Sequence, residues 1–403
     1  MRIRATILAA ALLLAGPARA ATVEWWQFWT DPAIKPVIEQ MVAEFEQANP
    51  DIKVRLTDLT WANGHEKIVL AFSSGTAPDV VELGSDWIAQ FAANGRLADL
   101  SGLVAGDTAG YDGWSMAADR GGLYAWPWIL GTRVLFGNRD LITRAGYDTA
   151  FYPVNWPQLT EAAKKVRALG PNFYGWGSNT AEKHRLYKKY LPFFWSAGAQ
   201  LFSDDGRMCV VASSRAVSAL RTYQQLHDSA GYVDTQRGIE DAFLDGRIGF
   251  IISGDWLLKR IELENRRINL ISTLIPGPKF PGRSFLGGEF LAVSADSDVK
   301  EAALRLIRFV TSPVNQVRFC RANRSANPSS REAQRDPYFA SNPHLQTFIA
   351  ALKSAQHPPV DPDWVYIEDI LEKAVEEALF GSHLVAVPLL EARYKIEELK
   401  GLK

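Results

Sequence analysis

The segment from Ala71 to Asp99, AFSSGTAPDVVELGSDWIAQFAANGRLAD, changes its hydrophobic periodicity twice. A helical pattern ends at Gly75, an apolar run from 79 to 83 predicts a short buried strand, and a second helical pattern from 86 to 93 ends just before the next glycine. A strand flanked by helices is the repeating unit of α/β folds, in which helices connect parallel strands. This segment therefore restricts the chain to α/β architectures.

The same alternation continues on both sides of that segment. Strand patterns cover 22–29, 52–56 and 248–252, and helical patterns cover 156–169 and 214–230. The final third of the chain is predominantly helical. We therefore predict largely parallel sheets with helical connections. The length of 403 residues favours two domains rather than one.

The beginning of the chain predicts export. Two arginines precede an apolar run from 5 to 15, and the small-residue triplet Ala18-Arg19-Ala20 follows it. This is the pattern of a secretory signal peptide over residues 1–20, cleaved after Ala20, and the apolar run is too short to span a bilayer. The residue directly after the cleavage position is Ala21, not the cysteine that a lipid anchor would need. We therefore expect a freely soluble periplasmic protein, with secretion into the medium as the alternative.

Charge and motifs argue against several functional classes. Removing the signal peptide removes three arginines and no acid, so the formal net charge goes from −1 to −4, and nothing points to nucleic acid or an anionic membrane as partner. The chain has no G-x-S-x-G, H-E-x-x-H or Walker motif, and its six histidines are scattered. We expect a monomer with no catalytic residue, no cofactor and no metal.

Aromatic content suggests a ligand class. The chain has thirteen tryptophans. The flat C–H face of a pyranose stacks on an indole, so an exported chain rich in tryptophan favours carbohydrate, although cores and domain contacts also use this residue. Cys209 and Cys320 are the only cysteines. Export permits a disulfide between them, and two buried thiols in different lobes are the preferred interpretation.

Six segments in order resemble one protein family. They are the helix pattern ending in FEQANP, then SSGTAPDVVELGSDW, GGLYAWPWILGTRVLFGNRDLITRAGYD, NWPQLTEAAKKV, FLDGRIGFIISGDW and FLGGEFLAVSADSDVKEAALRLIRFVTSP. Together they cover nearly the whole mature chain. The chain resembles the substrate-binding proteins of ABC importers, in the sugar-binding group called extracellular solute-binding family 1, which includes maltose- and trehalose-binding proteins.

This resemblance implies a two-lobed periplasmic-binding-protein fold of type II-like architecture, with the ligand cleft between the lobes. The N-terminal lobe is expected over 21–131 plus 277–327, and the C-terminal lobe over 132–276 plus 328–403. Crossing segments are expected near 131–133, 276–282 and 323–330, where Gly, Pro and short polar residues permit changes in φ and ψ. A cleft between two such lobes brings strand ends and helix N-termini together, and hinge closure buries the ligand.

The expected ligand contacts lie at strand ends and loop starts. They are Gln27, Trp29, Trp61, Asn63, Glu82, Ser85, Asp86, Trp126, Trp128, Arg133, Trp256, Gly287, Gly288 and Glu289. The resemblance implies stacking on Trp61, on one of Trp126 and Trp128, and above all on Trp256. It also implies orientation by Glu82, Asp86 and Glu289, and close approach of the ligand to the backbone at the glycine pair.

Several of these residues have a second interpretation. Trp61 is equally consistent with packing on its own lobe, Asp86 with a helix N-cap, and Arg133 with a hinge salt bridge. The chain also departs from the family pattern, because Gly84 stands where relatives carry an aspartate and Asp255 where they carry a proline. Relatives that bind disaccharides can carry an aromatic residue at the position of Glu289. These departures leave the identity of the sugar open.

The function we predict is capture of a sugar or oligosaccharide, with an α-glucoside as one candidate, and its delivery to the membrane permease of an ABC importer. Two alternatives come from other classes. A secreted glycoside hydrolase would also combine tryptophans with a pair of carboxylates. A binding protein for a phosphorylated polyol would need a cluster of cations in the cleft, for which Arg133 and Arg324 are the candidates.

Overall fold

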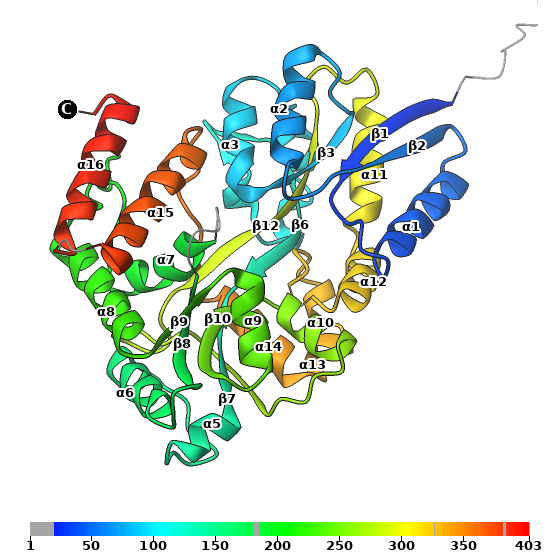
Figure 1. Ribbon diagram of the computed structural model, residues 1–403. Helices are drawn as coiled ribbons and strands as arrows, with labels where there is room; N and C mark the ends of the chain where they lie inside the picture. The colour runs from blue at the N-terminus through cyan, green and yellow to red at the C-terminus, as the bar shows by residue number, and fades with distance from the viewer. Residues whose placement is uncertain (1–19, 180–184, 326, 382–383, 403) are drawn as a thin grey trace, which may run out of the picture.

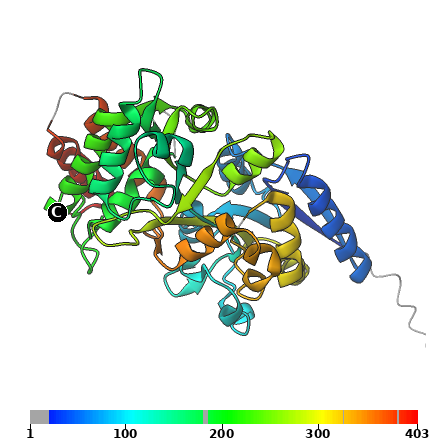
Figure 2. The same cartoon turned by 90° about the horizontal axis from the view of Figure 1, so that it is seen from below.

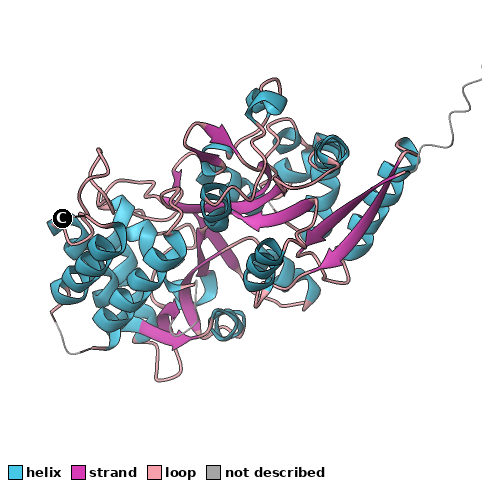
Figure 3. Cartoon of the chain, turned by 90° about the horizontal axis from the view of Figure 1, so that it is seen from above, coloured by secondary structure: helices cyan, strands magenta, loops and turns pink. Residues whose placement is uncertain are grey.

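The computed structural model describes residues 20–179, 185–325, 327–381 and 384–402. Two β-sheets with flanking helices account for most of this part of the chain (Figures 1 and 3). The longest strand of the first sheet, β12 (Ser284–Val293), runs beside β6 (Trp126–Thr132) between the two halves of the molecule (Figure 1). The mixed α/β architecture predicted from periodicity is confirmed.

The first sheet contains six strands. Its order is β13 (Ala355–Gln356), β12, β3 (Val80–Gly84), β1 (Ala21–Gln27) and β2 (Ile52–Asp58), with β6 also paired to β12. Strand β1 is parallel to β2 and β3, whereas β12 is antiparallel to β3 and β6. The sheet is therefore parallel over its N-terminal strands and becomes mixed where the returning strand enters it.

The second sheet contains five strands, in the order β11 (Leu270–Thr273), β7 (Val134–Asn138), β10 (Ile248–Ser253), β8 (Tyr174–Asn179) and β9 (Gly231–Asp234). Strand β8 is parallel to β9 and β10, and β7 is antiparallel to β10 and β11. A small hairpin pairs β4 (Ala118–Asp119) with β5 (Gly122–Leu123). All six residues of β10 are buried, as its continuous apolar run predicts for an interior strand.

Helices cover both sheets. Those in the chain up to β6, and between β12 and β13, are α1 (Lys35–Ala48), α2 (Gly64–Ser74), α3 (Ser85–Ala93), α4 (Ser101–Val104), α11 (Lys300–Val310), α12 (Pro313–Asn323), α13 (Pro337–Ala340) and α14 (Pro343–Leu352). The others are α5 (Arg139–Arg144), α6 (Trp156–Arg167), α7 (Leu186–Ser196), α8 (Ser214–Ala230), α9 (Gln236–Leu244), α10 (Trp256–Leu263), α15 (Trp364–Phe380) and α16 (Ala386–Lys400). Helix α8 has the predicted bounds because Ser213 caps its first turn.

The chain passes between the sheets at several points. Strand β6 belongs to the first sheet and β7 to the second, so Arg133 stands at a crossing. The connection from β11 to β12 crosses back over 274–283. After β12 the chain returns to the first sheet at β13, and then α15 packs on α7, α8 and α16. The C-terminal helices lie at the end of the molecule opposite β1 and β2 (Figure 2). The last passage of the chain from the first sheet to the C-terminal helices therefore lies at 357–363. The lobe boundaries expected from the sequence stay predictions.

The two thiols lie in separate parts of the core. Cys209 and Cys320 are both free and buried. Cys320 packs in the cluster that includes Trp25 and Phe319, and Cys209 packs in the cluster that includes Trp176. Burial raises the pKa of Cys320 to about 12, so this thiol stays protonated and inert near neutral pH.

Candidate functional site

The glycine pair of β12 allows three elements to meet at the crossing. A side chain at Gly288 would lie 2.5 Å from the carbonyl oxygen of Ile129, so no larger residue fits without moving β6. A Cβ at Gly287 would lie 3.4 Å from Ser85 Oγ at the start of α3. Both glycines therefore bring β6 and α3 against β12, which is a packing role beside the ligand role expected from the resemblance.

Phe28, Trp61 and Trp87 pack together beside the end of β3 and form an aromatic wall on the side of the crossing that belongs to the first sheet. Trp61 is 44% exposed and stacks on Phe28, with ring centroids 4.1 Å apart. The ring centroids of Trp87 and Trp61 are 5.5 Å apart. A Cβ at Gly84 would meet the Trp61 ring at 3.7 Å, so the glycine leaves the indole accessible from the end of β3. Trp61 is thus supported by its own side of the molecule and still offers a face to solvent.

Asp86 joins the two sides of the molecule. It lies in the first turn of α3, and the N-cap of that helix is Gly84. Tyr187 Oη donates a hydrogen bond to Asp86 Oδ2 at 3.0 Å, and Lys188 Nζ lies 3.2 Å from the same oxygen. Both partners come from the chain around α7, which packs with the second sheet. The carboxylate therefore holds α3 and α7 together.

Trp256 occupies the N-terminus of α10, directly after β10. Its Nε1 donates to Glu240 Oε1 at 2.6 Å, and Arg260 Nη1 holds Glu240 Oε2 at 2.8 Å. A Cβ at Gly254 would lie 1.9 Å from the indole, so this ring position requires glycine two residues earlier. The indole is partly exposed. Sequence reasoning missed Glu240, which fixes the orientation of the ring that we expected to stack on sugar.

Arg133 approaches Trp256 from the crossing. Its Cζ lies 4.6 Å from the Trp256 ring centroid and its Nη1 donates to the Thr132 carbonyl at 3.0 Å. The side chain is buried, and the structure gives it no ion pair among the described residues, so the hinge salt bridge considered above is not present there. Burial first, and then the nearby Arg185, lowers the pKa of Arg133 to about 10.

Two further cations come from α7 and were not predicted. Lys188 pairs with Asp86, and Lys189 is only 3% exposed, with Nζ 5.8 Å from the Trp256 ring centroid. Burial first, and then the charge of Arg133, lowers the pKa of Lys189 well below its usual range. The available signal was a lysine at a core position of the apolar helix RLYKKYLPFFW, because buried lysines are rare without a purpose.

The two glutamates differ in environment. Glu82 is fully buried and accepts the Phe28 N–H at 2.9 Å, and burial raises its pKa well above the ordinary value. Glu289 is partly buried, and burial together with the neighbouring charge of Asp255 raises its pKa to about 7. Strand pairing sets Glu289 opposite Gly84. Glu289 is therefore next to the aromatic wall, whereas Glu82 supports the loop after β1 from inside.

The remaining predicted residues lie elsewhere. Trp126 and Trp128 are fully buried in β6, so neither indole is open to a ligand in this structure. Gln27 is buried and donates to Asp58, and Trp29 packs edge-on against Phe319. Asn63 is exposed beside Thr60, whose hydroxyl donates to its side chain. Ser85 differs from these residues, because its hydroxyl donates to Asp86 at the start of α3. The structure therefore gathers Trp61, Ser85, Asp86, Arg133, Trp256, Gly287, Gly288 and Glu289 around the crossing.

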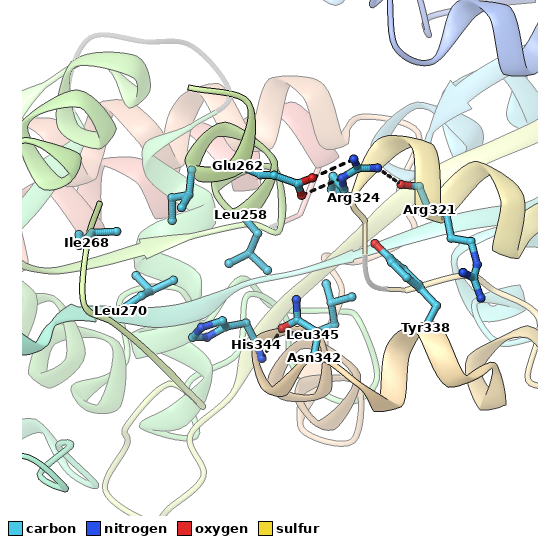
Figure 4. A pocket seen from close by; sticks show the side chains of 11 residues that line it. Leu258, Glu262, Ile268, Leu270, Arg321, Arg324, Tyr338, Asn342, His344 and Leu345 are labelled. Atoms are coloured by element: carbon cyan, nitrogen blue, oxygen red, sulfur yellow. Dashed lines mark hydrogen bonds and ion pairs between the residues drawn. The ribbon is translucent and has the colours of Figure 1, made fainter. Parts of the chain in front are cut away.

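A cavity of about 570 Å³ lies next to this region, on another face of α10. Figure 4 shows Leu258, Leu270 and Leu345 on its apolar side and the Glu262–Arg324 ion pair at one edge. Arg324 Nε donates to Glu262 at 2.8 Å. Arg324, considered above as a cation for a phosphorylated ligand, is therefore already paired and lines this cavity rather than the Trp256 region.

Comparison with known proteins places the chain in a family. The family described as bacterial extracellular solute-binding protein matches residues 30–317. The chain belongs to this family. A relative in Brucella abortus, named only as a binding protein, is 26% identical over 90% of each chain. The diacetylchitobiose-binding protein DasA of Streptomyces coelicolor is 25% identical over 82% of this chain and 78% of its own.

Solved structures agree with this assignment. The sugar-binding protein MalE of Xanthomonas citri is 25% identical, covers 94% of this chain and 98% of its own, and superposes with a TM-score of 0.84. This confirms the two-lobed periplasmic-binding-protein fold expected from the sequence. No helix within the described ranges of this solute-binding protein is long and apolar enough to cross a membrane.

Proposed function

We propose that this solute-binding protein captures a sugar or oligosaccharide in the periplasm and delivers it to the permease of an ABC importer. The observation that carries the proposal is a chain of contacts between two partly exposed tryptophans. Gly84 lies beside Trp61 and is paired with Glu289, Glu289 lies within electrostatic reach of Arg133, and Arg133 stacks over Trp256. Trp61 stands on the side of the first sheet and Trp256 on the side of the second. Aromatic faces with a few oriented polar groups are what a saccharide requires.

Capture by lobe closure is supported by contacts on two sides of the crossing. Asp86 meets Tyr187 and Lys188 on one side. On the other, Lys259 Nζ of α10 lies 3.0 Å from Asp31, in the loop after β1. These pairs are few, and because separation of the lobes would return both partners of each pair to water, they can break and re-form at modest cost.

The names of the relatives favour carbohydrate. DasA is named for diacetylchitobiose and the Xanthomonas protein is described as sugar-binding. We further propose that the protein does no chemistry on its ligand, acts as a monomer, and is exported with cleavage after Ala20. A secreted glycoside hydrolase remains the competing function, since Glu289 and Asp255 are carboxyl groups near one another.

Ligand screening tests the proposal. Tryptophan fluorescence and thermal shift of the mature protein would be measured against mono-, di- and trisaccharides and glycerol phosphates, and the bound ligand would be recovered and analysed by mass spectrometry. A saturable hit recovered unaltered supports a carrier. A sugar recovered cleaved would show that the protein is a hydrolase, and binding of a glycerol phosphate alone would favour the phosphorylated polyol.

A further inference from the structure

Trp256 is contacted by two buried cations that the structure does not pair with a carboxylate. Arg133 is 8% exposed and Lys189 is 3% exposed. The Arg133 guanidinium carbon lies 4.6 Å from the Trp256 ring centroid, and Lys189 Nζ lies 5.8 Å from it. Lys189 comes from α7 and Arg133 from the crossing between β6 and β7. Two elements that are distant in the sequence thus bring positive groups to one indole.

The neighbouring cations have partners, and these two do not. Lys188 is paired with Asp86 and Arg260 with Glu240. Neither Arg133 nor Lys189 has a carboxylate within ion-pair distance in the described part of the chain. Nε of Arg133 has no hydrogen-bond partner there either. The guanidinium is held in place by a single side-chain hydrogen bond, to the Thr132 carbonyl.

Burying such groups without an anion is costly. A charged side chain taken from water loses much of its hydration free energy, and cation–π contact with an indole recovers only part of it. Asp255 and Glu289 act on Arg133 only from beyond ion-pair distance. Glu240, the acid that acts on Lys189, is already engaged by Arg260, Ser253 and the Trp256 indole N–H. A perturbed, unpartnered buried basic group beside a binding region is a candidate for contact with a ligand that carries the opposite charge.

We propose that the saccharide bound by this protein carries an anionic group, and that Arg133 and Lys189 bind that group beside Trp256. This inference rests on the proposed function and names the class of its ligand: an acidic sugar, such as a uronic acid, or a sugar bearing phosphate or sulfate. The Arg133 guanidinium donates hydrogen bonds to two oxygens of the anion, and the Lys189 ammonium donates one more. The sugar ring lies on the Trp256 indole.

Charges facing this subsite come from α7, α9, β12 and the turn before α10, and Arg185 at the N-cap of α7 acts on both Arg133 and Lys189. Lys188 and Lys189 lie on α7, Glu240 lies on α9, and Asp255 precedes α10. Glu289 projects from β12 and has its pKa raised to about 7, so near neutral pH it carries only part of a charge. Acidic ligands therefore meet the Arg133 guanidinium, the Lys189 amine and a carboxyl group that is readily protonated. Burial lowers the pKa of Lys189, and an anion bound beside it would raise that pKa again, so this position favours an anion over a cation.

The test compares each acidic sugar with its own neutral form. Calorimetry on the mature protein would use D-galacturonic and D-glucuronic acid, their methyl esters, the parent hexoses, D-glucose 6-phosphate and D-glucose 6-sulfate. We expect at least tenfold tighter binding of one acidic sugar than of its neutral form. Lys189→Met and Arg133→Gln should each abolish this preference, and Lys189→Arg should retain it. The identity of the acidic sugar that binds shows whether the ligand's charge comes from a carboxylate, a phosphate or a sulfate.

Controls separate this inference from the proposed function. Arg324→Gln removes a cation that is paired with Glu262 outside the subsite, and it should leave the preference unchanged. Circular dichroism would confirm folding of each variant. Equal binding of acidic and neutral sugars overturns the acidic subsite and leaves a saccharide carrier. Absence of binding both to these monosaccharides and to the di- and trisaccharides of the ligand screen, by folded protein, overturns the proposed function as well.

Discussion

Replacing Trp256 by alanine tests the position of the ligand site most directly. The indole is partly exposed, lies 4.6 Å from the Arg133 guanidinium carbon and is oriented by its hydrogen bond to Glu240. Loss of a desolvated aromatic anchor costs about 2 kcal/mol of binding free energy, which corresponds to roughly a 30-fold rise in Kd. The variant should therefore bind the screened sugar at least tenfold more weakly.

The same substitution has a limited effect on stability. Glu240 keeps its bonds to Ser253 and Arg260 when the indole N–H is removed. We expect the thermal midpoint to fall by a few degrees, without loss of the folded state. Thermal denaturation of the unliganded protein would measure this, and calorimetry at a temperature well below the midpoint would measure Kd.

Trp256→Phe provides the matched control. It keeps an aromatic face and removes the Nε1 donor to Glu240, so it should weaken binding by less than the alanine variant. Trp61→Ala would show how much the exposed indole of the first-sheet side contributes. An unchanged Kd in folded Trp256→Ala would refute the placement of the ligand beside α10.

Three other predictions follow from individual groups. The pKa of Glu289 is raised to about 7 in the folded state from 4.5, so the folded state binds more protons than the unfolded state between these pH values. The free energy of unfolding should therefore fall as pH rises from 4.5 to 7. Urea titrations at several pH values would measure this dependence, and Glu289→Gln should make it weaker. Asp86→Asn should remove the ion pair with Lys188 and increase the radius of gyration of the unliganded protein in small-angle X-ray scattering, and an unchanged radius would show that this contact does not restrain the lobes. Cys209 and Cys320 should react with a thiol reagent only after denaturation, with both thiols then titrated, whereas rapid reaction in the native state would contradict their burial.

Periodicity predicted local structure well because helices and strands bury one face or one stripe at a fixed spacing. The pattern over 214–230 gave the bounds of α8, and the apolar run over 248–252 located β10 to within one residue. Glycines were also informative, since Gly254 and Gly288 stand where any Cβ would collide with an indole or a backbone carbonyl. The requirement at Gly254 is local, because Trp256 lies two residues on, whereas the requirement at Gly288 comes from the Ile129 carbonyl on a strand distant in the sequence.

The composition of the site depended on tertiary packing. Trp126 and Trp128 lie on a strand that is paired with β12 and enclosed by other aromatic residues, so both are buried, and one of them had been expected in the cleft. Lys189 lies in an apolar helix and meets Arg133 only because α7 and the crossing strand converge on Trp256. No spacing in the sequence records that convergence.

The sequence by itself determined the α/β class, most element positions, the crossing at Arg133 and, through six ordered segments, the family. Tertiary structure alone decided which polar side chains share a surface and which charges remain unpaired. The physical reason is range: periodicity, capping and turn chemistry act over a few residues, whereas desolvation and ion pairing depend on neighbours that the fold brings from far along the chain.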